Sequence, residues 1–290
     1  MARKKSLDRR RHGIQALVAL LTNSYLLGFI QGKIYRGPLK QLCVPGLNCY
    51  SCPGALGSCP VGALQAVLGS RRYQFAYYVA GFLVLVGALV GRFVCGYLCP
   101  FGLVQELLHK IPFPKKCRTF RGDRLLRKLK YGILAVFVIL LPLFAVDAWG
   151  QGQPWFCKLI CPAGTLEGGI PLVLLNSELR QAVGWLYAWK SVILGVTIFL
   201  SILIYRPFCK YICPLGAVYA LFQRVSVFRY RVDRDKCVNC GACAKVCGMN
   251  LNPVEEANHP ECIRCGRCKR ACPTGAVSCG FTGPRHQKKQ

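Results

Sequence analysis

Residues 237–247 read CVNCGACAKVC, and residues 262–273 read CIRCGRCKRACP. Within each run, two residues separate the first three cysteines from one another, and three residues separate the third cysteine from the fourth. A [4Fe–4S] cluster needs four thiolates that converge from different directions, and this spacing is typical of chains that bind two such clusters. The two runs therefore predict two [4Fe–4S] clusters and one-electron chemistry.

The fourth cysteine of each run is expected to bind the cluster of the other run, because the three-residue step turns the chain away. Cluster A would then be bound by Cys237, Cys240, Cys243 and Cys272. Cluster B would be bound by Cys262, Cys265, Cys268 and Cys247. Structural zinc sites also use paired cysteines, but they do not require this run twice. A disulfide framework is the other alternative, whereas cysteines at cluster spacing suit a reducing compartment.

The composition points to a membrane protein. The chain has 290 residues, of which 53% are hydrophobic and only 17% are charged, yet its net charge is +28. A soluble protein that binds nucleic acid would be richer in charged residues and poorer in long apolar runs. The basic excess is better explained by cytoplasmic loops, so we expect no nucleic-acid partner and a lipid bilayer around part of the chain.

Four apolar segments approach the roughly 20 residues that a helix needs to cross a bilayer. They are residues 14–31, 73–91, 131–149 and 184–205. The first is the weakest, because Thr22, Asn23 and Ser24 lie in its middle, and a signal peptide is the alternative there. We therefore expect a mainly α integral membrane protein, with four transmembrane helices in two parallel repeats and a C-terminal α+β module of the bacterial 2[4Fe–4S] ferredoxin type.

Basic residues set the expected orientation. Lys and Arg concentrate in residues 1–13, in 92–130 and after 205, and are sparse in 32–72 and 150–183. Basic loops stay on the cytoplasmic side, so we expect a multi-pass protein of the inner membrane with both termini in the cytoplasm. The expected parts are a basic N-terminus at 1–13, a four-helix membrane domain at 14–229, a ferredoxin domain at 230–280 and a basic tail at 281–290.

A short motif recurs after the second and fourth apolar segments. Residues 92–102 read RFVCGYLCPFG, and residues 206–216 read RPFCKYICPLG. A third copy, CKLICPAG at 157–164, and a partial copy, CPVG at 59–62, fall in the two expected outer loops. The chain thus divides into halves at 14–111 and 131–225, which we expect to be related by an axis along the membrane normal.

These CxxxCP motifs predict further cysteine sites. An inner site would be formed by Cys95, Cys99, Cys209 and Cys213, which is the ligand count of one cluster. The outer loops hold enough cysteines for a fourth cluster with two to spare, namely Cys43, Cys49, Cys52, Cys59, Cys157 and Cys161. Proline after the second cysteine suits the first turn of a helix, and the dipole of that helix would favour an anionic cluster beside it.

Other interpretations of the CxxxCP cysteines stay open. In these alternatives the cysteines are small buried apolar residues, redox-active dithiols or ligands of a transient metal ion. In an oxidising space, Cys43 to Cys59 would instead form disulfides. Cys117 and Cys279 have no partner by spacing. No histidine shows an axial-ligand pattern, so we expect no haem, and no glycine-rich phosphate loop opens a helix.

The segments CGYLCPFG and CKYICPLG, joined to the tandem cysteine runs, resemble the polyferredoxin membrane proteins of the NapH type. These are relatives of the accessory proteins NosR and CcoG. The resemblance covers about residues 14–280 and implies an integral inner-membrane electron carrier between quinol or cytoplasmic donors and extracytoplasmic acceptors. This chain departs from the pattern in its cysteine-rich outer loop, CVPGLNCYSCPGALGSCPVGALQ at 43–65.

We therefore expect an electron-transfer protein rather than a stand-alone enzyme, with no catalytic residues of its own. Electrons would enter the ferredoxin clusters from a ferredoxin, a flavodoxin-like protein or quinol. They would pass to the inner site and leave through the outer cysteines to an extracytoplasmic redox partner. The CcoG-type resemblance suggests an alternative, a maturation factor that reduces copper or a thiol for another enzyme. A redox sensor is a third hypothesis, and no DNA-binding or kinase pattern supports it.

Overall fold

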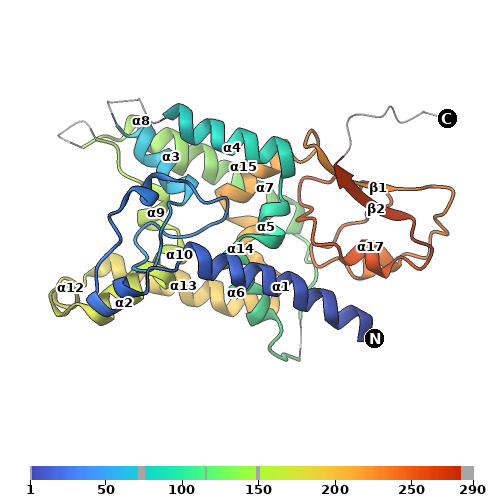
Figure 1. Cartoon of the computed structure of the whole chain (residues 1–290), viewed down its shortest axis with the longest axis horizontal. Coiled ribbons are helices and arrows are strands. Elements are labelled where there is room, and N and C mark those ends of the chain that lie inside the picture. The colour runs from blue at the N-terminus through green and yellow to red at the C-terminus, as the bar shows by residue number, and fades with distance from the viewer. Residues whose placement is uncertain (1, 71–75, 115, 148–150, 282–290) are drawn as a thin grey trace.

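The computed structural model of the chain describes residues 2–70, 76–114, 116–147 and 151–281. A body of helices occupies most of it, and a small module with two strands lies at one end (Figure 1). Parts of the expected organisation lie outside the described residues. These are residues 73–75 and 148–149 of the apolar segments and residues 282–290 of the basic tail.

The helices of the N-terminal part of the body are α1 (Ala2–Thr22), α2 (Leu26–Gln31), η1 (Pro38–Gln41), α3 (Pro60–Leu68), α4 (Ala76–Val90), α5 (Phe93–Tyr97) and α6 (Pro100–His109). Those of the C-terminal part are α7 (Asp123–Ile133), η3 (Leu134–Leu140), α8 (Leu141–Phe144), α9 (Trp155–Leu159), α10 (Pro162–Gly164), η4 (Thr165–Gly169), α11 (Ile170–Leu175), α12 (Ser177–Gln181), α13 (Trp185–Leu203), α14 (Pro207–Tyr211) and α15 (Pro214–Phe222). In Figure 1, α4 and α15 lie on one side of the body and α13 and α6 on the other, and the members of each pair contact each other.

The expected set of four transmembrane helices is wrong. Among the described residues, one helix is long and apolar enough to cross a membrane, and that helix is α13. The predicted span 14–31 is two helices, since α1 ends at Thr22 and α2 begins at Leu26. The described part of the span 73–91 is helical over only the 15 residues of α4. The span 131–149 stops being helical after Phe144.

Polar side chains and a left-handed glycine explain two of these breaks. At the end of α1, Thr22 Oγ1 donates to Val18 O at 2.8 Å, and Asn23 Nδ2 donates to Ala19 O at 2.9 Å. Such side-chain bonds compete with the backbone bonds that would continue the helix. Gly91, with a φ of 53°, ends α4, because a left-handed residue terminates a helix. The length of an apolar run in the sequence does not reveal where such side chains or glycines interrupt the helix.

Each proline that follows a CxxxCP or CPxG cysteine starts a helix, as the sequence predicts. Pro60, Pro100, Pro162 and Pro214 begin α3, α6, α10 and α15. The missing N–H of proline costs nothing at this position, where a helix has no internal acceptor for it. The preceding cysteine therefore lies at the N-cap, with its thiol at the start of the helix, in all four motifs.

Aromatic residues next to the cysteines form the centre of the core. Phe101 and Phe208 are buried and meet edge to face, with ring centroids 5.2 Å apart. Phe156, which precedes Cys157, and Tyr219 are also fully buried. The core thus lies between the helices that carry the cysteines, and it holds those helices in place.

The module is closed by two antiparallel strands, β1 (Phe228–Val232) and β2 (Val277–Phe281). The strands pair with Phe228 opposite Phe281 and Val232 opposite Val277. The two cysteine runs lie between them, with the short helices α16 (Ala242–Lys245) and α17 (Arg267–Ala271) in contact with each other. The strand pair therefore brings the beginning and the end of the cysteine-rich segment together.

A buried arginine fixes the module to the body. Arg264 donates to Val90 O at 2.9 Å, to Gln223 O at 2.9 Å and to Ser226 Oγ at 2.7 Å. Its φ is 53°, a strained value for a residue with a side chain. Three hydrogen bonds to the ends of α4 and α15 offset that strain, so the cluster B loop has a defined position on the body.

Candidate metal centres

The two cysteine runs of the module share one backbone conformation. Gly241 and Gly266, which follow the second cysteine of each run, have φ values of 68° and 81°. Asn239 and Arg264, which precede that cysteine, have φ values of 49° and 53°. Glycine adopts a positive φ without strain, and its missing side chain leaves room beside the backbone. Each run therefore forms a tight loop in which successive cysteines can face one centre.

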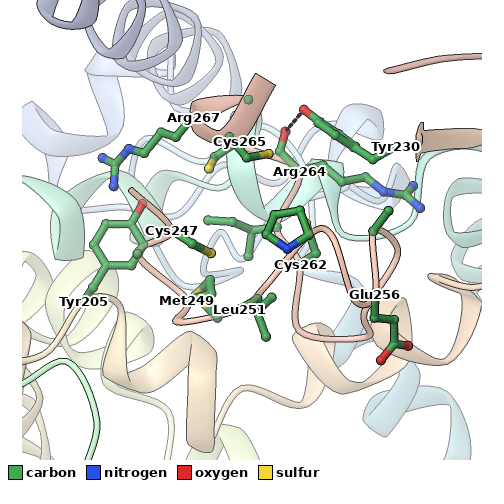
Figure 2. Close-up of a pocket in the computed structure, with 16 residues that line it drawn as sticks. Tyr205, Tyr230, Cys247, Met249, Leu251, Glu256, Cys262, Arg264, Cys265 and Arg267 are labelled. Atoms are coloured by element: carbon green, nitrogen blue, oxygen red, sulfur yellow. Dashed lines mark hydrogen bonds between the residues drawn. The ribbon is translucent and has the colours of Figure 1, made fainter. Parts of the chain in front are cut away.

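The four cysteines expected around cluster B surround one pocket (Figure 2). Cys262, Cys265 and Cys268 come from the second run, and Cys247 comes from the first. Burial, together with the neighbouring thiols of Cys265 and Cys247, raises the pKa of the Cys262 thiol to about 12. Figure 2 shows Tyr205 and Arg267 at one end of this pocket and Tyr230 at the other. Tyr230 donates its hydroxyl to Arg264 O at 3.3 Å.

The cysteines expected around cluster A lie toward solvent. Cys243 is buried in α16 and Cys240 is exposed. Cys272 follows α17, and its thiol lies 3.6 Å from Thr274 Oγ1. Because α16 contacts α17, the structure brings Cys243 and Cys272 into the same part of the module.

The inner site is assembled from both halves of the chain. Cys95 lies in α5 and Cys209 in α14, while Cys99 and Cys213 are the N-cap residues of α6 and α15. All four are buried. Burial raises the pKa of the Cys213 thiol well above its usual range, and the thiols of Cys209, Cys95 and Cys99 raise it further. The structure therefore brings together the four cysteines that the repeat predicts.

Two arginines cross between the halves at this site. Arg92, which begins the first motif, donates to Cys209 O at 3.1 Å. Arg206, which begins the second motif, donates to Cys95 O. Each guanidinium also packs on the glycine of the opposite motif. A Cβ at Gly102 would lie 2.9 Å from Arg206 Nη1, and one at Gly216 would lie 3.4 Å from Arg92 Nη2. The glycines of the two motifs thus make room for this exchange.

The buried charges around the inner site fit an anionic cluster. Five cationic side chains are buried there, namely Arg11, Arg92, Arg206, Lys130 and Lys210. The buried carboxylates that pair with them are Glu106, Asp123 and Glu261. A buried charge without a partner is strongly unfavourable. The excess of positive charge would be balanced by a [4Fe–4S] cluster with four thiolates, which is negatively charged.

Orphaned donors support the same fit. The Nε atoms of Arg92 and Arg206 are buried, and within the described part of the chain no acceptor reaches them. A buried donor without an acceptor is costly, and the inorganic sulfides and thiolate sulfurs of a cluster are acceptors. The donor set at the inner site is therefore chemically suited to a cluster.

The outer cysteines separate into two groups. Cys49, Cys59, Cys157 and Cys161 line one cavity of about 480 Å³, and we call these four the outer site. Cys43 and Cys52 are also buried, but they are not among the residues that line it. All twenty cysteines of the chain are free thiols, so the structure does not contain the disulfides considered for Cys43 to Cys59.

Two buried glutamines contact the cysteines, and the sequence interpretation missed them. Gln105 donates from Nε2 to Cys209 Sγ at 3.1 Å, and its Oε1 accepts from Phe208 N at 3.2 Å. Gln65 makes the same pair of bonds with Cys157 Sγ at 3.3 Å and Phe156 N at 2.9 Å. Both glutamines lie six residues after a cysteine, in CPVGALQ and CPFGLVQ. Alignment of the motifs beyond their glycines would have found them.

The arrangement favours clusters over single metal ions. Among the described residues, no three His, Cys, Asp or Glu side chains lie close enough together to hold one metal ion. A single zinc or copper ion would draw its ligands onto one point, whereas a cubane holds its four thiolates apart by its own width. Each buried group of four cysteines matches the ligand count of one cubane.

Comparison with known families agrees with this chemistry. A family model described as "4Fe-4S binding domain" matches residues 73–121 and 187–233, which contain the four inner cysteines. A second model with the same description matches residues 230–250 and 258–278, which contain the two cysteine runs. The chain carries 4Fe-4S domains of the ferredoxin type. The cofactor prediction of [4Fe–4S] clusters is thereby confirmed.

Three relatives identify the wider group. The methylamine utilization ferredoxin-type protein MauN of Paracoccus denitrificans is 28% identical over 252 residues, which are 85% of this chain and 76% of MauN. The regulatory protein NosR of Stutzerimonas stutzeri is 31% identical over 180 residues, 60% of this chain and 22% of NosR. YccM of Escherichia coli, whose name assigns it to electron transport, is 25% identical over 182 residues, 60% of this chain and 45% of YccM.

The chain is thus a homologue of polyferredoxin-like electron-transport proteins, as its motifs predict. No solved structure matches it.

Proposed function

We propose that this chain passes electrons, one at a time, between its ferredoxin-type clusters and a third [4Fe–4S] cluster at the inner site. Cys95, Cys99, Cys209 and Cys213 would hold this third cluster, and the two runs of the module would hold clusters A and B with the ligands predicted above. The convergence of four buried cysteines from both halves of the chain, among buried cations in excess, is the observation that supports this proposal.

The contact between module and body supports the order of transfer. Gly96 directly follows Cys95 in α5, and a Cβ on it would be 2.3 Å from Ile263 O and 3.8 Å from Cys265 N. The backbone of the cluster B loop therefore lies directly on the helix that carries Cys95. Electron tunnelling falls steeply with distance, so cluster B would exchange electrons with the inner site, and cluster A would exchange them with a partner.

The surface around cluster A suits an acidic partner. Lys236, Lys245, Lys269 and Arg270 are exposed in the module close in sequence to the cysteines of cluster A. Positive charge at an electron-entry point speeds the approach of an acidic protein. We propose a soluble ferredoxin or flavodoxin-like protein as the cytoplasmic partner, and an extracytoplasmic redox protein at the other end of the body.

We propose that α13 attaches the chain to the inner membrane. This helix has 19 residues and a mean hydropathy of 1.8 in its most apolar window, of which 17% is buried. Trp185 and Trp189 are exposed near its start, where aromatic residues favour the membrane interface. Exposed apolar side chains such as Val192, Val196 and Phe199 would then contact lipid.

Iron content tests the inner cluster. After anaerobic purification, we expect at least twelve irons per chain, about four for each of clusters A, B and the inner cluster. Cys213→Ala should remove about four of them, and its matched control, the exposed Cys117→Ala, should remove none. About eight irons in the wild type, with no loss in Cys213→Ala, would contradict the inner cluster and favour reduction of a metal or thiol by the CxxxCP cysteines.

A further inference from the structure

We propose that Cys49, Cys59, Cys157 and Cys161 bind a further [4Fe–4S] cluster, and that Cys43 and Cys52 are not ligands. The inference extends the relay of the proposed function by one step and rests on it for the source of the electron. One electron would leave the reduced inner cluster and reduce the outer cluster, and no bond to hydrogen or carbon would form or break.

The outer site has two equivalent halves, and its glycines show this most directly. Gly62 follows Cys59, and a Cβ on it would lie 3.8 Å from Cys157 Sγ. Gly164 follows Cys161, and a Cβ on it would lie 3.7 Å from Cys49 Sγ. The glycine of each CPxG segment thus faces a cysteine of the other half. Cys49 therefore occupies the position that Cys157 occupies in the opposite half.

The residue six positions after the cysteine reaches the opposite half of the site in both cases. Gln65 donates to Cys157 Sγ at 3.3 Å. Glu167, six residues after Cys161, accepts from the backbone N–H of Cys49 at 2.6 Å. Gln65 thus contacts the sulfur of Cys157 and Glu167 the backbone of Cys49, so the same position of each half lies against the cysteine that the glycines pair. Spacing alone hides this equivalence, since Cys49 lies ten residues before Cys59 and Cys157 lies four before Cys161.

The outer cavity also contains polar groups that lack partners. Asn48 lines it and is fully buried, and neither its Nδ2 nor its Oδ1 has a hydrogen-bond partner among the residues that the structure describes. Lys190 lines the same cavity and can supply positive charge. A buried amide is costly without a partner, whereas it can donate to the sulfur of a bound cluster. The cavity thus offers four thiols, one donor and one cation.

A short segment connects the outer and inner sites. A Cβ on Gly46 would lie 3.0 Å from the Cα of Cys99 in the inner site, and Asn48, two residues later, lines the outer cavity together with Cys59. Tyr219, fully buried, donates its hydroxyl to Pro45 O at 2.9 Å and so holds the same segment. Residues two positions apart therefore border the two sites, and the path that we propose for the electron from the inner to the outer cluster follows this segment.

The test compares two cysteines of the same loop. Cys49→Ala should lower the iron and acid-labile sulfide by about four atoms per chain relative to the wild type, which would hold about sixteen. Cys52→Ala, three residues away, should leave both unchanged. Cys161→Ala repeats the loss from the other half of the site. The EPR signals of clusters A and B, unchanged in each variant, show that the chain has folded.

The outcomes separate this inference from the proposed function. Loss of iron in Cys213→Ala but not in Cys49→Ala or Cys161→Ala would overturn the outer cluster and leave the inner cluster intact. Loss in Cys49→Ala but not in Cys213→Ala would support the outer cluster and overturn the proposed relay. Equal loss in Cys49→Ala and Cys52→Ala would contradict the ligand assignment. If Cys49→Ala does not fold, Cys161→Ala decides the question by the same readout.

Discussion

Gln105 illustrates how single side chains adjust a cluster site. It donates to the sulfur of Cys209 and accepts from the backbone next to it, so it both orients the cysteine and stabilises negative charge on its sulfur. Hydrogen bonds to cluster sulfurs are one of the means by which proteins set reduction potentials. Gln65 has the same position relative to Cys157. Each glutamine therefore influences the reduction potential of a different centre.

Gln105→Leu should make the reduction potential of the inner cluster more negative. The N–H···S bond that stabilises the reduced, more negatively charged cluster is lost, while the volume of the side chain is nearly kept. A redox titration followed by EPR measures the shift. Gln65→Leu is the matched control, because it should shift the outer centre instead. An unchanged potential in Gln105→Leu would show that this bond does not influence the cluster.

Glu106 is expected to be the most costly single carboxylate to remove. It pairs with the buried Arg206 at 2.5 Å and with the buried Arg11. Glu106→Gln should destabilise the protein by about 3–5 kcal/mol, as measured for broken buried ion pairs. Thermal denaturation checks this, with Glu256→Gln as control. The Glu256 pair with Arg224 is exposed, so its loss should cost less than about 1 kcal/mol.

The pH dependence of this effect has a defined sign. Burial alone would raise the pKa of Glu106, but the charge of Arg206 and the hydrogen bonds from His12 and Arg11 lower it well below its usual range. A group with a lowered pKa stabilises the fold fully above its unfolded pKa, about 4.3 for Glu, and loses that contribution as the pH falls below it. The difference between wild type and Glu106→Gln should therefore be constant through neutral pH.

At the scale of elements, α5 connects the module to the inner site, because it carries Cys95 and contacts the cluster B loop. Gly96→Ala would place a methyl group 2.3 Å from Ile263 O, and the cluster B loop would have to move away from α5. We expect normal iron content and slower electron transfer from cluster B to the inner cluster, measured by rapid mixing with a reductant. Gly132→Ala in α7 is the control, since its Cβ would meet nothing within 4 Å. Equal rates in both variants would contradict the proposed contact.

The sequence predicted well the features that are determined by residues close together in the chain. The cysteine spacing predicted the cluster type, and proline predicted the start of α3, α6, α10 and α15. The equivalence of Cys49 and Cys157 was not predictable, because Cys49 reaches its position through an irregular loop rather than through a fixed spacing. Three of the four spans failed, the first because apolar run length does not register polar side chains such as Thr22 and Asn23, which end a helix from within. The fourth span, 184–205, contains α13, which is long and apolar enough to cross a membrane.

At the scale of the whole molecule, the apolar surface of α13 should determine where the protein is found. Val196→Arg would place a charge on an exposed part of this helix, at a cost of about 2.5–3.5 kcal/mol if that part lies in lipid. We expect a smaller share of the chain in membranes washed with carbonate. Val238→Arg, on an exposed valine of the module, should not change that share. Equal amounts of both variants in the washed membranes would contradict the attachment by α13.

The crossing of Arg92 and Arg206 between the halves has a consequence for how the protein is made. Each arginine holds the backbone of a cysteine more than 100 residues away along the chain, and each group of four cysteines in the body draws on both halves. A ribosome that has released only the first half has therefore released half of each site. The outer site is complete only once synthesis has passed residue 161, and the inner site only once it has passed residue 213. A chain truncated between these two points would therefore lack the inner cluster, and one truncated before residue 161 would lack both.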